Sequence, residues 1–302
     1  MNFTTEVRLE PPATGAPSKL KEEGYVIRRR KALRRVDREL SKGNFKNALS
    51  LVKQLKGKPF GLRGFGAAKQ VPKNGSALDK FEFDGVNLSP FRALVNSVMD
   101  SIENHAQFSL EDDDSREYSC EEDHFLCLQH EAGHFLVGYL LGALPKAYRV
   151  PSMEELRYGE FAGAKVEFLG FEFLREVGAA QMLRKNNTNE EACSKGSRGK
   201  ISSKTLNHFS CIILGGLVVE HLVFGHSRGH YYDVDKLNST FEWLNLPDVD
   251  ASFQVRWAAI NTIFVLNRHH KARSKLAETM STGQSIGYCI EAIENAIDEN
   301  EI

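Results

Sequence analysis

The chain has 302 residues, of which 41% are hydrophobic and 10% aromatic, with 39 Lys and Arg against 40 Asp and Glu. This balance supports a buried core and excludes a disordered or collagen-like chain. Five cysteines without a C-x-x-C pair exclude a disulfide-stapled secreted scaffold and favour a soluble protein in a reducing intracellular compartment. No uncharged apolar stretch reaches 18 residues, so we expect no membrane-spanning segment.

The charge is distributed unevenly along the chain. Residues 1–74 carry 18 Lys and Arg against 6 Asp and Glu, and the remainder carries 21 against 34. A basic segment of this kind can meet nucleic acid, an anionic membrane surface or an acidic partner, and the count alone does not choose among them. The extreme N-terminus lacks the apolar core of a signal peptide and the acid-poor composition of a transit peptide, so we expect either a chain that is not imported or a leader outside this sequence.

The N-terminal region is predicted to hold a basic helical hairpin. Residues 1–18 are rich in Pro, Gly and Thr and are expected to be disordered, and residues 19–56 are predicted to form two helices that break at 41–44. The basic run at 28–31 is interpreted as a solvated helix face in preference to a nucleic-acid or targeting patch. The apolar faces of the two helices are expected at Leu33, Val36, Leu40, Phe45, Ala48, Leu49, Val52 and Leu55.

Residues 57–118 are predicted to connect this hairpin to a second unit. The stretch 57–76 is rich in Gly, Pro and Lys and is interpreted as a linker, and residues 91–102 have helical apolar spacing. Eight of the thirteen residues from 111 to 123 are acidic, which indicates a solvated loop and a domain boundary. A domain spanning residues 119–302 is therefore expected.

That domain is predicted to be mainly α (α+β), with a small β-sheet. Ser119 and Glu122 form a capping box for a helix that ends near Gly142 and Pro145. Residues 164–174 are the best strand candidate, and 186–200 are interpreted as a polar surface insertion. Further helices are expected at 204–224, 234–244, 253–280 and 286–297.

The first helix of the domain carries an H-E-x-x-H motif formed by His130, Glu131 and His134. A spacing of four residues turns a helix by about 400°, so both imidazoles emerge on one face, where they can occupy two corners of a Zn²⁺ site. Glu131 would lie beside the metal and act as the general base that activates water and later protonates a leaving amine. Random placement gives about 0.03 copies of this pattern in such a chain, which favours a true metal site over two ordinary histidines.

A catalytic zinc site needs a third protein ligand and an open position. The metzincin extension is excluded, because Val137 and Leu140 stand where it requires Gly and His. Asp233 is the best candidate, since it lies four residues before Leu237 and shares the apolar face of its helix, whereas Asp235 is expected to meet water. The readings that stay open are a plain N-cap role for Asp233 and ligation by Glu154, Glu155, Glu160, His226 or His230.

The helix that precedes Asp233 carries a carboxylate, Glu220, within its apolar stripe. Because a buried carboxylate needs a partner, Glu220 either orients a zinc-binding imidazole or another active-site group, or forms an ion pair with a basic side chain. Gly215 and Gly216 in the same helix predict a close approach to another helix. The remaining histidines are interpreted as ordinary surface or core residues, among them His208, His221, His269 and His270.

Three motifs, in this order, resemble the peptidase domain of the FtsH-type ATP-dependent zinc metalloproteases. They are HEAGH at 130–134, GGLVVEHLVFG at 215–225 and D-V-x-x-L from Asp233. The resemblance covers residues 119–282 and implies a helical, zincin-like fold in which His130, His134 and Asp233 bind zinc and Glu131 is the base. The chain departs from the family at Leu217, where the family has Arg, in a longer spacing from the histidines to Asp233, and in lacking both the membrane anchor and the G-x-x-x-x-G-K-[ST] phosphate loop.

The sequence is most similar to the stand-alone, stress-regulated FtsH-like proteins of plants, which implies a chloroplast location.

The leading hypothesis is a zinc metalloendopeptidase that cuts unfolded or flexible proteins. It would act as a homo-oligomer or with an FtsH-type ATPase in trans, and no nucleic-acid partner is expected. An extended substrate would pair with an edge strand near 147–150 or 163–173. The alternatives are a proteolytically inactive adaptor that docks onto FtsH-type complexes through the basic hairpin, and zinc-dependent hydrolysis of a non-peptide bond.

Overall fold

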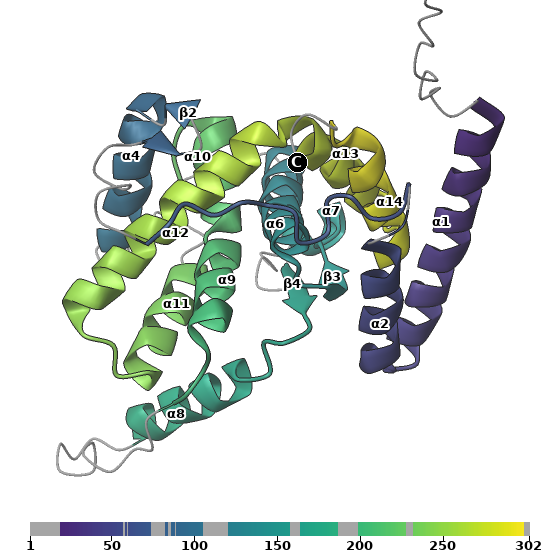
Figure 1. Cartoon of the computed structure of the whole chain (residues 1–302). Coiled ribbons are helices and arrows are strands. Elements are labelled where there is room, and N and C mark those ends of the chain that lie inside the picture. The colour runs from purple at the N-terminus through teal and green to yellow at the C-terminus, as the bar shows by residue number, and fades with distance from the viewer. Residues whose placement is uncertain are drawn as a thin grey trace, which may run out of the picture.

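The computed structural model describes residues 19–56, 58, 60–73, 82–83, 86–87, 89–104, 120–157, 164–186, 199–227 and 232–298. Over these residues the chain is mainly helical with two small antiparallel strand pairs, which confirms the expected fold class in its coarse form (Figure 1). The elements are α1 (Lys19–Ser41), α2 (Phe45–Lys56), β1 (Glu82–Phe83), β2 (Val86–Asn87), η1 (Ser89–Phe91), α4 (Arg92–Glu103), α6 (Cys120–Leu141), β3 (Pro145–Arg149), α7 (Met153–Arg157), β4 (Lys165–Phe168), α8 (Leu174–Asn186), α9 (Ser203–Ile213), α10 (Gly215–Phe224), α11 (Tyr232–Trp243), α12 (Asp248–Arg268), α13 (His270–Ser281) and α14 (Ile286–Ala296).

The predicted hairpin is present as α1 and α2 at the outer edge of the molecule (Figure 1). The turn between them is made at Gly43, whose φ of +73° is a left-handed conformation that glycine adopts without strain. Leu33 and Val36 of α1 and Val52 of α2 are buried, as the apolar spacing predicts. The hairpin therefore rests on the rest of the protein through its apolar face and leaves the opposite face to solvent.

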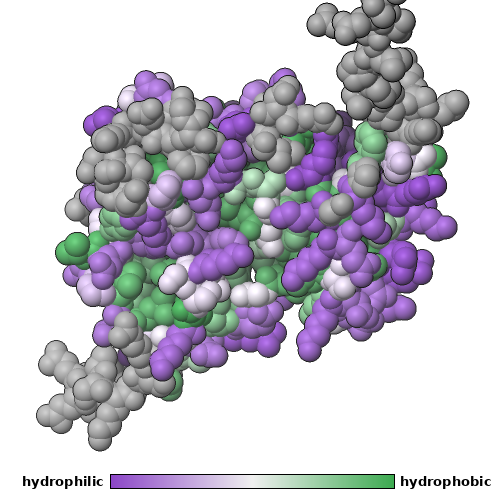
Figure 2. All heavy atoms as spheres, viewed as in Figure 1, coloured by the Kyte–Doolittle hydropathy of each residue, from purple (hydrophilic) through white to green (hydrophobic). Residues whose placement is uncertain are grey.

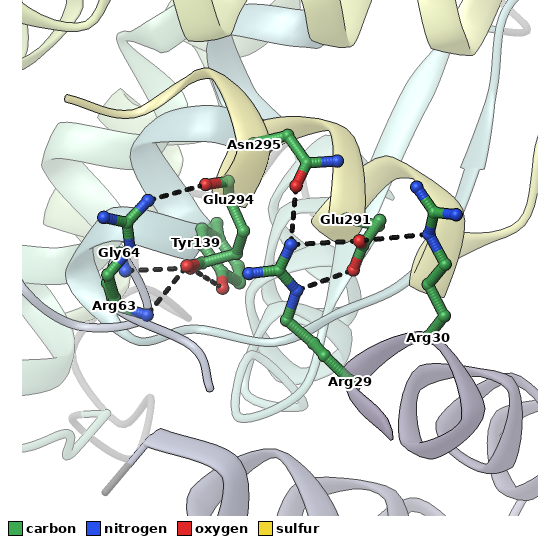
Figure 3. Close-up of polar contacts among 8 residues, drawn as sticks. All are labelled: Arg29, Arg30, Arg63, Gly64, Tyr139, Glu291, Glu294 and Asn295. Atoms are coloured by element: carbon green, nitrogen blue, oxygen red, sulfur yellow. Dashed lines mark hydrogen bonds and ion pairs between the residues drawn. The ribbon is translucent and has the colours of Figure 1, made fainter. Parts of the chain in front are cut away.

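Arg29 is an exception to the predicted solvated face of α1. Its side chain is 6% exposed, and its Nε donates to Glu291 Oε2 at 2.7 Å, while Nη2 donates to Asn295 Oδ1 at 2.6 Å (Figure 3). The other basic residues of the run, at 28, 30 and 31, are exposed as expected. The prediction was wrong at Arg29 because its carboxylate partner lies on α14, 262 residues away, and no local pattern reports such a contact.

Residues 60–73 pack against the body of the protein, although the composition of this stretch indicated a linker. Leu62, Phe65 and Val71 are buried. The Val71 N–H donates to Asn261 Oδ1 at 2.6 Å, and the Val71 carbonyl accepts from Trp257 Nε1 at 2.7 Å. Gly and Pro correctly indicate an irregular backbone here, but composition does not report whether an irregular segment buries its apolar side chains.

Glu294 on α14 joins this packed segment to the centre of the fold. Its carboxylate accepts hydrogen bonds from the N–H groups of Arg63 and Gly64, both at 2.8 Å, and from the Tyr139 hydroxyl on α6 at 2.5 Å (Figure 3). Glu294 is fully buried. A buried carboxylate costs free energy unless donors surround it, and three donors meet that requirement here.

The helix α6 is the centre of the core. Residues 126–141 are all buried, and α9, α10, α12 and α13 pack against α6. The antiparallel pair β3–β4 lies on the same helix, where the Phe168 ring occupies the space above Gly138. One continuous cluster of buried side chains extends from Leu33 in α1 to Ile297 after α14, so the hairpin and the C-terminal region share a core.

Several predicted helices are confirmed, and two are interrupted. The helices expected at 91–102, 234–244 and 286–297 are present as α4, α11 and α14. The helix expected at 204–224 divides at Leu214 into α9 and α10, and the one expected at 253–280 divides at His269 into α12 and α13. The helix α8 was not predicted. Residues 1–18, the capping residue Ser119, most of the acidic tract and most of the polar insertion lie outside the described residues.

One stretch of the described chain, Ser203–Phe224, has the length and composition of a membrane span. It corresponds to α9 and α10 together, and 72% of its most apolar window is buried inside the protein. Core helices of soluble proteins pass the same test of length and hydropathy. The expectation that no segment spans a membrane therefore stays a prediction.

Candidate metal centre

The two histidines of the H-E-x-x-H motif lie on one buried face of α6. His130 and His134 are each 6% exposed, and their Nε2 atoms are 3.0 Å apart. This proximity follows from the four-residue spacing, because the two side chains lie one helical turn apart on the same face of the helix. The motif therefore forms the paired arrangement that its spacing predicts.

Asp233 completes a three-residue cluster from the start of α11. Its Oδ2 atom lies 3.0 Å from His130 Nε2 and 2.8 Å from His134 Nε2, and its side chain is 14% exposed. The three donor atoms all lie within 4.8 Å of one another, so this group could hold a metal ion. Asp235 faces solvent, as predicted from its position on the other side of α11.

The outer nitrogen of each imidazole is fixed by an acceptor. His130 Nδ1 lies 2.7 Å from Glu220 Oε1, and His134 Nδ1 lies 2.7 Å from the carbonyl oxygen of Ile212. When each Nδ1 donates its hydrogen to these acceptors, the lone pair of each Nε2 points into the cluster. Metal-binding histidines have this second contact almost always. Of the two predicted roles for Glu220, contact with an imidazole is the one that the structure shows.

The close approach predicted from Gly215 and Gly216 is present between α10 and α6. A Cβ atom added to Gly216 would lie 2.2 Å from His130 Nε2, and one added to Gly133 would lie 2.4 Å from the Gly215 carbonyl oxygen. Real Cβ atoms do not approach other atoms so closely. The glycines therefore let α10 come near enough for Glu220 to reach the far side of the His130 ring.

The surroundings of the Glu131 carboxylate indicate that a further group binds beside it. It is 3% exposed, and its Oε2 atom has no hydrogen-bond partner among the described residues. Burial raises the pKa of Glu131, against the lowering effect of His134 and His130. Burial of a carboxylate oxygen without a hydrogen-bond partner costs folding free energy. Its position beside the three donors fits a centre that holds a metal ion and water.

The three donors are strongly coupled electrostatically. Burial disfavours the imidazolium form of His130, but the Asp233 and Glu220 carboxylates outweigh burial and hold the pKa of His130 well above its usual value. Burial likewise disfavours the ionised form of Asp233, but His134 and His130 hold its pKa well below the usual range. A proton and a metal ion would therefore compete for the same nitrogen.

The other ligands considered from sequence are not brought to this cluster within the described residues. His226 is exposed. Glu155 bonds to the backbone N–H of Ser152 at 2.7 Å and pairs with Arg149. Glu154 is exposed, and Glu160 and His230 lie outside the described residues.

Sequence reasoning missed three groups around the cluster. They are the Ile212 carbonyl, the Ser227 hydroxyl, which donates to Glu220 Oε2 at 3.0 Å, and Lys236, whose Nζ lies 3.7 Å from Asp233 Oδ1. A backbone carbonyl carries no side-chain signal, because every residue has one. The contact of Lys236 with Asp233 could have been predicted, since Lys236 lies three residues after Asp233 on the same helix face.

The site thus has the composition of a histidine and carboxylate metal centre on an H-E-x-x-H helix. No protein-family model, curated protein or solved structure matches this chain.

Proposed function

We propose that the protein is a zinc-dependent metalloendopeptidase with a zincin-like, FtsH-type peptidase fold. The observation that carries the proposal is the convergence of His130, His134 and Asp233 next to Glu131, whose buried Oε2 atom has no hydrogen-bond partner in the part of the chain that the structure describes. Two imidazole nitrogens and one carboxylate oxygen are ligands typical of a catalytic zinc site that keeps one open position. Zinc is favoured over magnesium or calcium because those ions prefer sites built from oxygen atoms alone.

When bound, zinc supplies Lewis acidity toward a scissile carbonyl and increases the acidity of water. The chain's own residues then carry the proton. Glu131 accepts a proton from the attacking water at Oε2, the oxygen that has no partner among the described residues, and returns it to the leaving amine. The buried position of Glu131 next to His130 on α6 keeps its carboxyl group beside the reacting atoms through both steps.

Glu220 and the Ile212 carbonyl act as positioning groups. Each holds one imidazole through Nδ1, which fixes the tautomer and aims Nε2 into the cluster. These contacts come from α10 and from the last turn of α9, which meet at the break at Leu214. The interruption of the apolar segment therefore serves the site, because it brings a main-chain carbonyl and a carboxylate to two histidines one turn apart.

The substrates are proposed to be unfolded or flexible polypeptides. An extended chain can add through backbone hydrogen bonds to an edge of the β3–β4 pair, which has no third strand among the described residues. Folded substrates would require an ATPase partner in trans to unfold them, because the sequence has no phosphate-binding loop of the Walker type.

The test is cleavage of fluorescently labelled casein by the zinc-loaded protein and by Glu131→Gln. We expect Glu131→Gln to lose about 100-fold or more in rate while it keeps its zinc. The matched control is Glu278→Gln, which changes an exposed carboxylate on α13 and should leave the rate unchanged. Equal activity of Glu131→Gln and wild type would contradict the mechanism. Wild-type protein that holds zinc but does not cleave casein would contradict the endopeptidase and favour the inactive adaptor.

A further inference from the structure

The exposed face of α1 is strongly basic. Between residues 24 and 42, where every side chain is described, the exposed charged residues are all cationic. In Figure 2 the hydrophilic colour covers the side of the molecule where Figure 1 places α1 and α2. The exposed basic residues between 24 and 42, here called the basic face, are Arg28, Arg30, Lys31, Arg34, Arg35, Arg38 and Lys42.

The basic face forms a continuous strip along the helix. At about 100° per residue, its members occupy about 160° of the helix circumference, directly opposite Leu33 and Val36, which are buried. Residues 28, 31, 35, 38 and 42 follow one another at intervals of three and four, so they form a row about 21 Å long. A row of this length presents several cations to a partner at once.

Within residues 24–42 the two acidic side chains, Asp37 and Glu39, have hydrogen-bond partners outside the basic face, although Glu39 also lies near the charges of Lys42 and Arg38. Asp37 accepts hydrogen bonds from the Gly287 N–H at 2.6 Å and the Ser285 hydroxyl at 2.7 Å, at the start of α14. Glu39 accepts from Asn44 and Asn47 in the neighbouring turn and α2, at 3.1 and 3.2 Å. The segregation of charge along this helix is therefore a property of its packing.

The face is also held rigidly. Arg29, on the buried side of α1, bonds to both Glu291 and Asn295 of α14, and Arg30 reaches Glu291 from the edge of the basic face (Figure 3). Because α1 is fixed by these contacts, binding to the face costs little ordering of the backbone.

An aliphatic side chain within the strip indicates which kind of anionic partner the face fits. Ile27 is 64% exposed, and its helical position lies between those of Arg34 and Lys31 on the circumference. Sequence-independent binding of single-stranded nucleic acid relies on exposed aromatic rings, and the one aromatic residue of this stretch, Tyr25, is stacked on Phe60 with ring centroids 4.9 Å apart. The centre of a protein interface is depleted of charge, which this face is not.

We propose that the basic face of α1 is a docking surface for an anionic phospholipid bilayer. The guanidinium groups bind lipid phosphates, for which Arg is well suited, and Ile27 enters the boundary between headgroups and acyl chains. Because α1 lies at the outer edge of the molecule, its exposed side can approach such a surface (Figure 1). The attachment is peripheral and reversible, and it is independent of the metal centre.

The test measures binding of the full chain to vesicles in which about a third of the lipid is phosphatidylserine and the rest phosphatidylcholine. We expect binding that weakens with added salt and is absent on pure phosphatidylcholine. The triple variant Lys31→Gln, Arg35→Gln, Arg38→Gln should bind roughly 100-fold more weakly, at about 5-fold for each charge removed.

Two further variants separate the proposal from a general effect of charge. Changing three exposed lysines elsewhere in the chain, Lys200, Lys204 and Lys271, to Gln removes the same charge and should leave vesicle binding within about 2-fold of wild type. Ile27→Ser should weaken vesicle binding by about 5-fold. Circular dichroism should show all variants folded.

The same proteins are titrated with an oligonucleotide of arbitrary sequence and with polyglutamate. Tighter binding of either polymer than of the anionic vesicles at physiological salt would overturn the proposal in favour of nucleic acid or an acidic protein. Equal loss of vesicle binding in the two triple variants, or no loss in either, would also overturn it.

Discussion

The contact between Gly216 and His130 makes Gly216→Ala a sharp probe of the metal centre. The added Cβ would lie 2.2 Å from Nε2, 2.3 Å from Cε1 and 2.5 Å from Cδ2 of the His130 ring. The ring cannot move freely, because Glu220 holds its Nδ1 at 2.7 Å. Either the ring leaves this contact, or α10 moves away from α6.

Both responses have a measurable cost. Overpacking of this kind destabilises a protein by about 1–3 kcal/mol, and disturbing the groups that orient a ligand lowers metal affinity by about 10–100-fold. We therefore expect the metal-free Gly216→Ala variant to lose about 1–3 kcal/mol of unfolding free energy in denaturant, and its zinc dissociation constant to rise by at least about 10-fold.

The control is Gly178→Ala on α8, where the added Cβ meets nothing within 4 Å. This change should stabilise the protein by up to about 1 kcal/mol through helix propensity and should leave zinc affinity unchanged. The reasoning would be refuted if Gly216→Ala bound zinc as tightly as wild type and unfolded at the same denaturant concentration.

Three further perturbations have defined outcomes. Glu220→Ala should weaken zinc binding by about 10–100-fold in a chelator competition assay, and unchanged affinity would show that the contact with His130 is not an orienting one. Arg29→Ala should cost about 3–5 kcal/mol in denaturant unfolding, because it leaves Glu291 buried without its main partner, whereas the exposed Arg28→Ala should cost less than about 0.5 kcal/mol. Burial lowers the pKa of His269 to about 4, so the unfolded chain takes up a proton first as the pH falls below about 6.5. The free energy of unfolding should thus fall by on the order of 2–3 kcal/mol between pH 7 and pH 4, and His269→Gln should remove that part of the loss; identical pH profiles of the two proteins would contradict it.

The sequence predicts those elements whose apolar pattern is simple. The hairpin, α4, α11 and α14 each have one apolar face, and each is present at about the expected residues. The interruption at Leu214 is not visible in the pattern, because apolar residues continue on both sides of it, and the one at His269 falls in a polar stretch that contains neither Gly nor Pro. The packed segment 60–73 and buried Arg29 depend on partners far along the chain, which no local window contains.

The site could be predicted further than the fold around it. The spacing of His130 and His134 within one helix determines their geometry, and the position of Asp233 relative to Leu237 predicts which way its side chain points. The Ile212 carbonyl could not be found in the same way, since the main chain is identical at every residue. The assignments of zinc, of proteolysis and of the FtsH-type family stay predictions.

The contacts of α14 have a consequence for biogenesis. Arg29 and Tyr139 contact carboxylates that lie 262 and 155 residues further along the chain, and His130 contacts Asp233, which lies 103 residues further along. A chain emerging from the ribosome therefore carries both histidines well before it can assemble the cluster. The cluster therefore cannot form until Asp233 has been synthesised and has left the ribosome. The contacts of Arg29 and Tyr139 with α14 form later still, so the packing of the N-terminal hairpin is completed only after α14 has been synthesised.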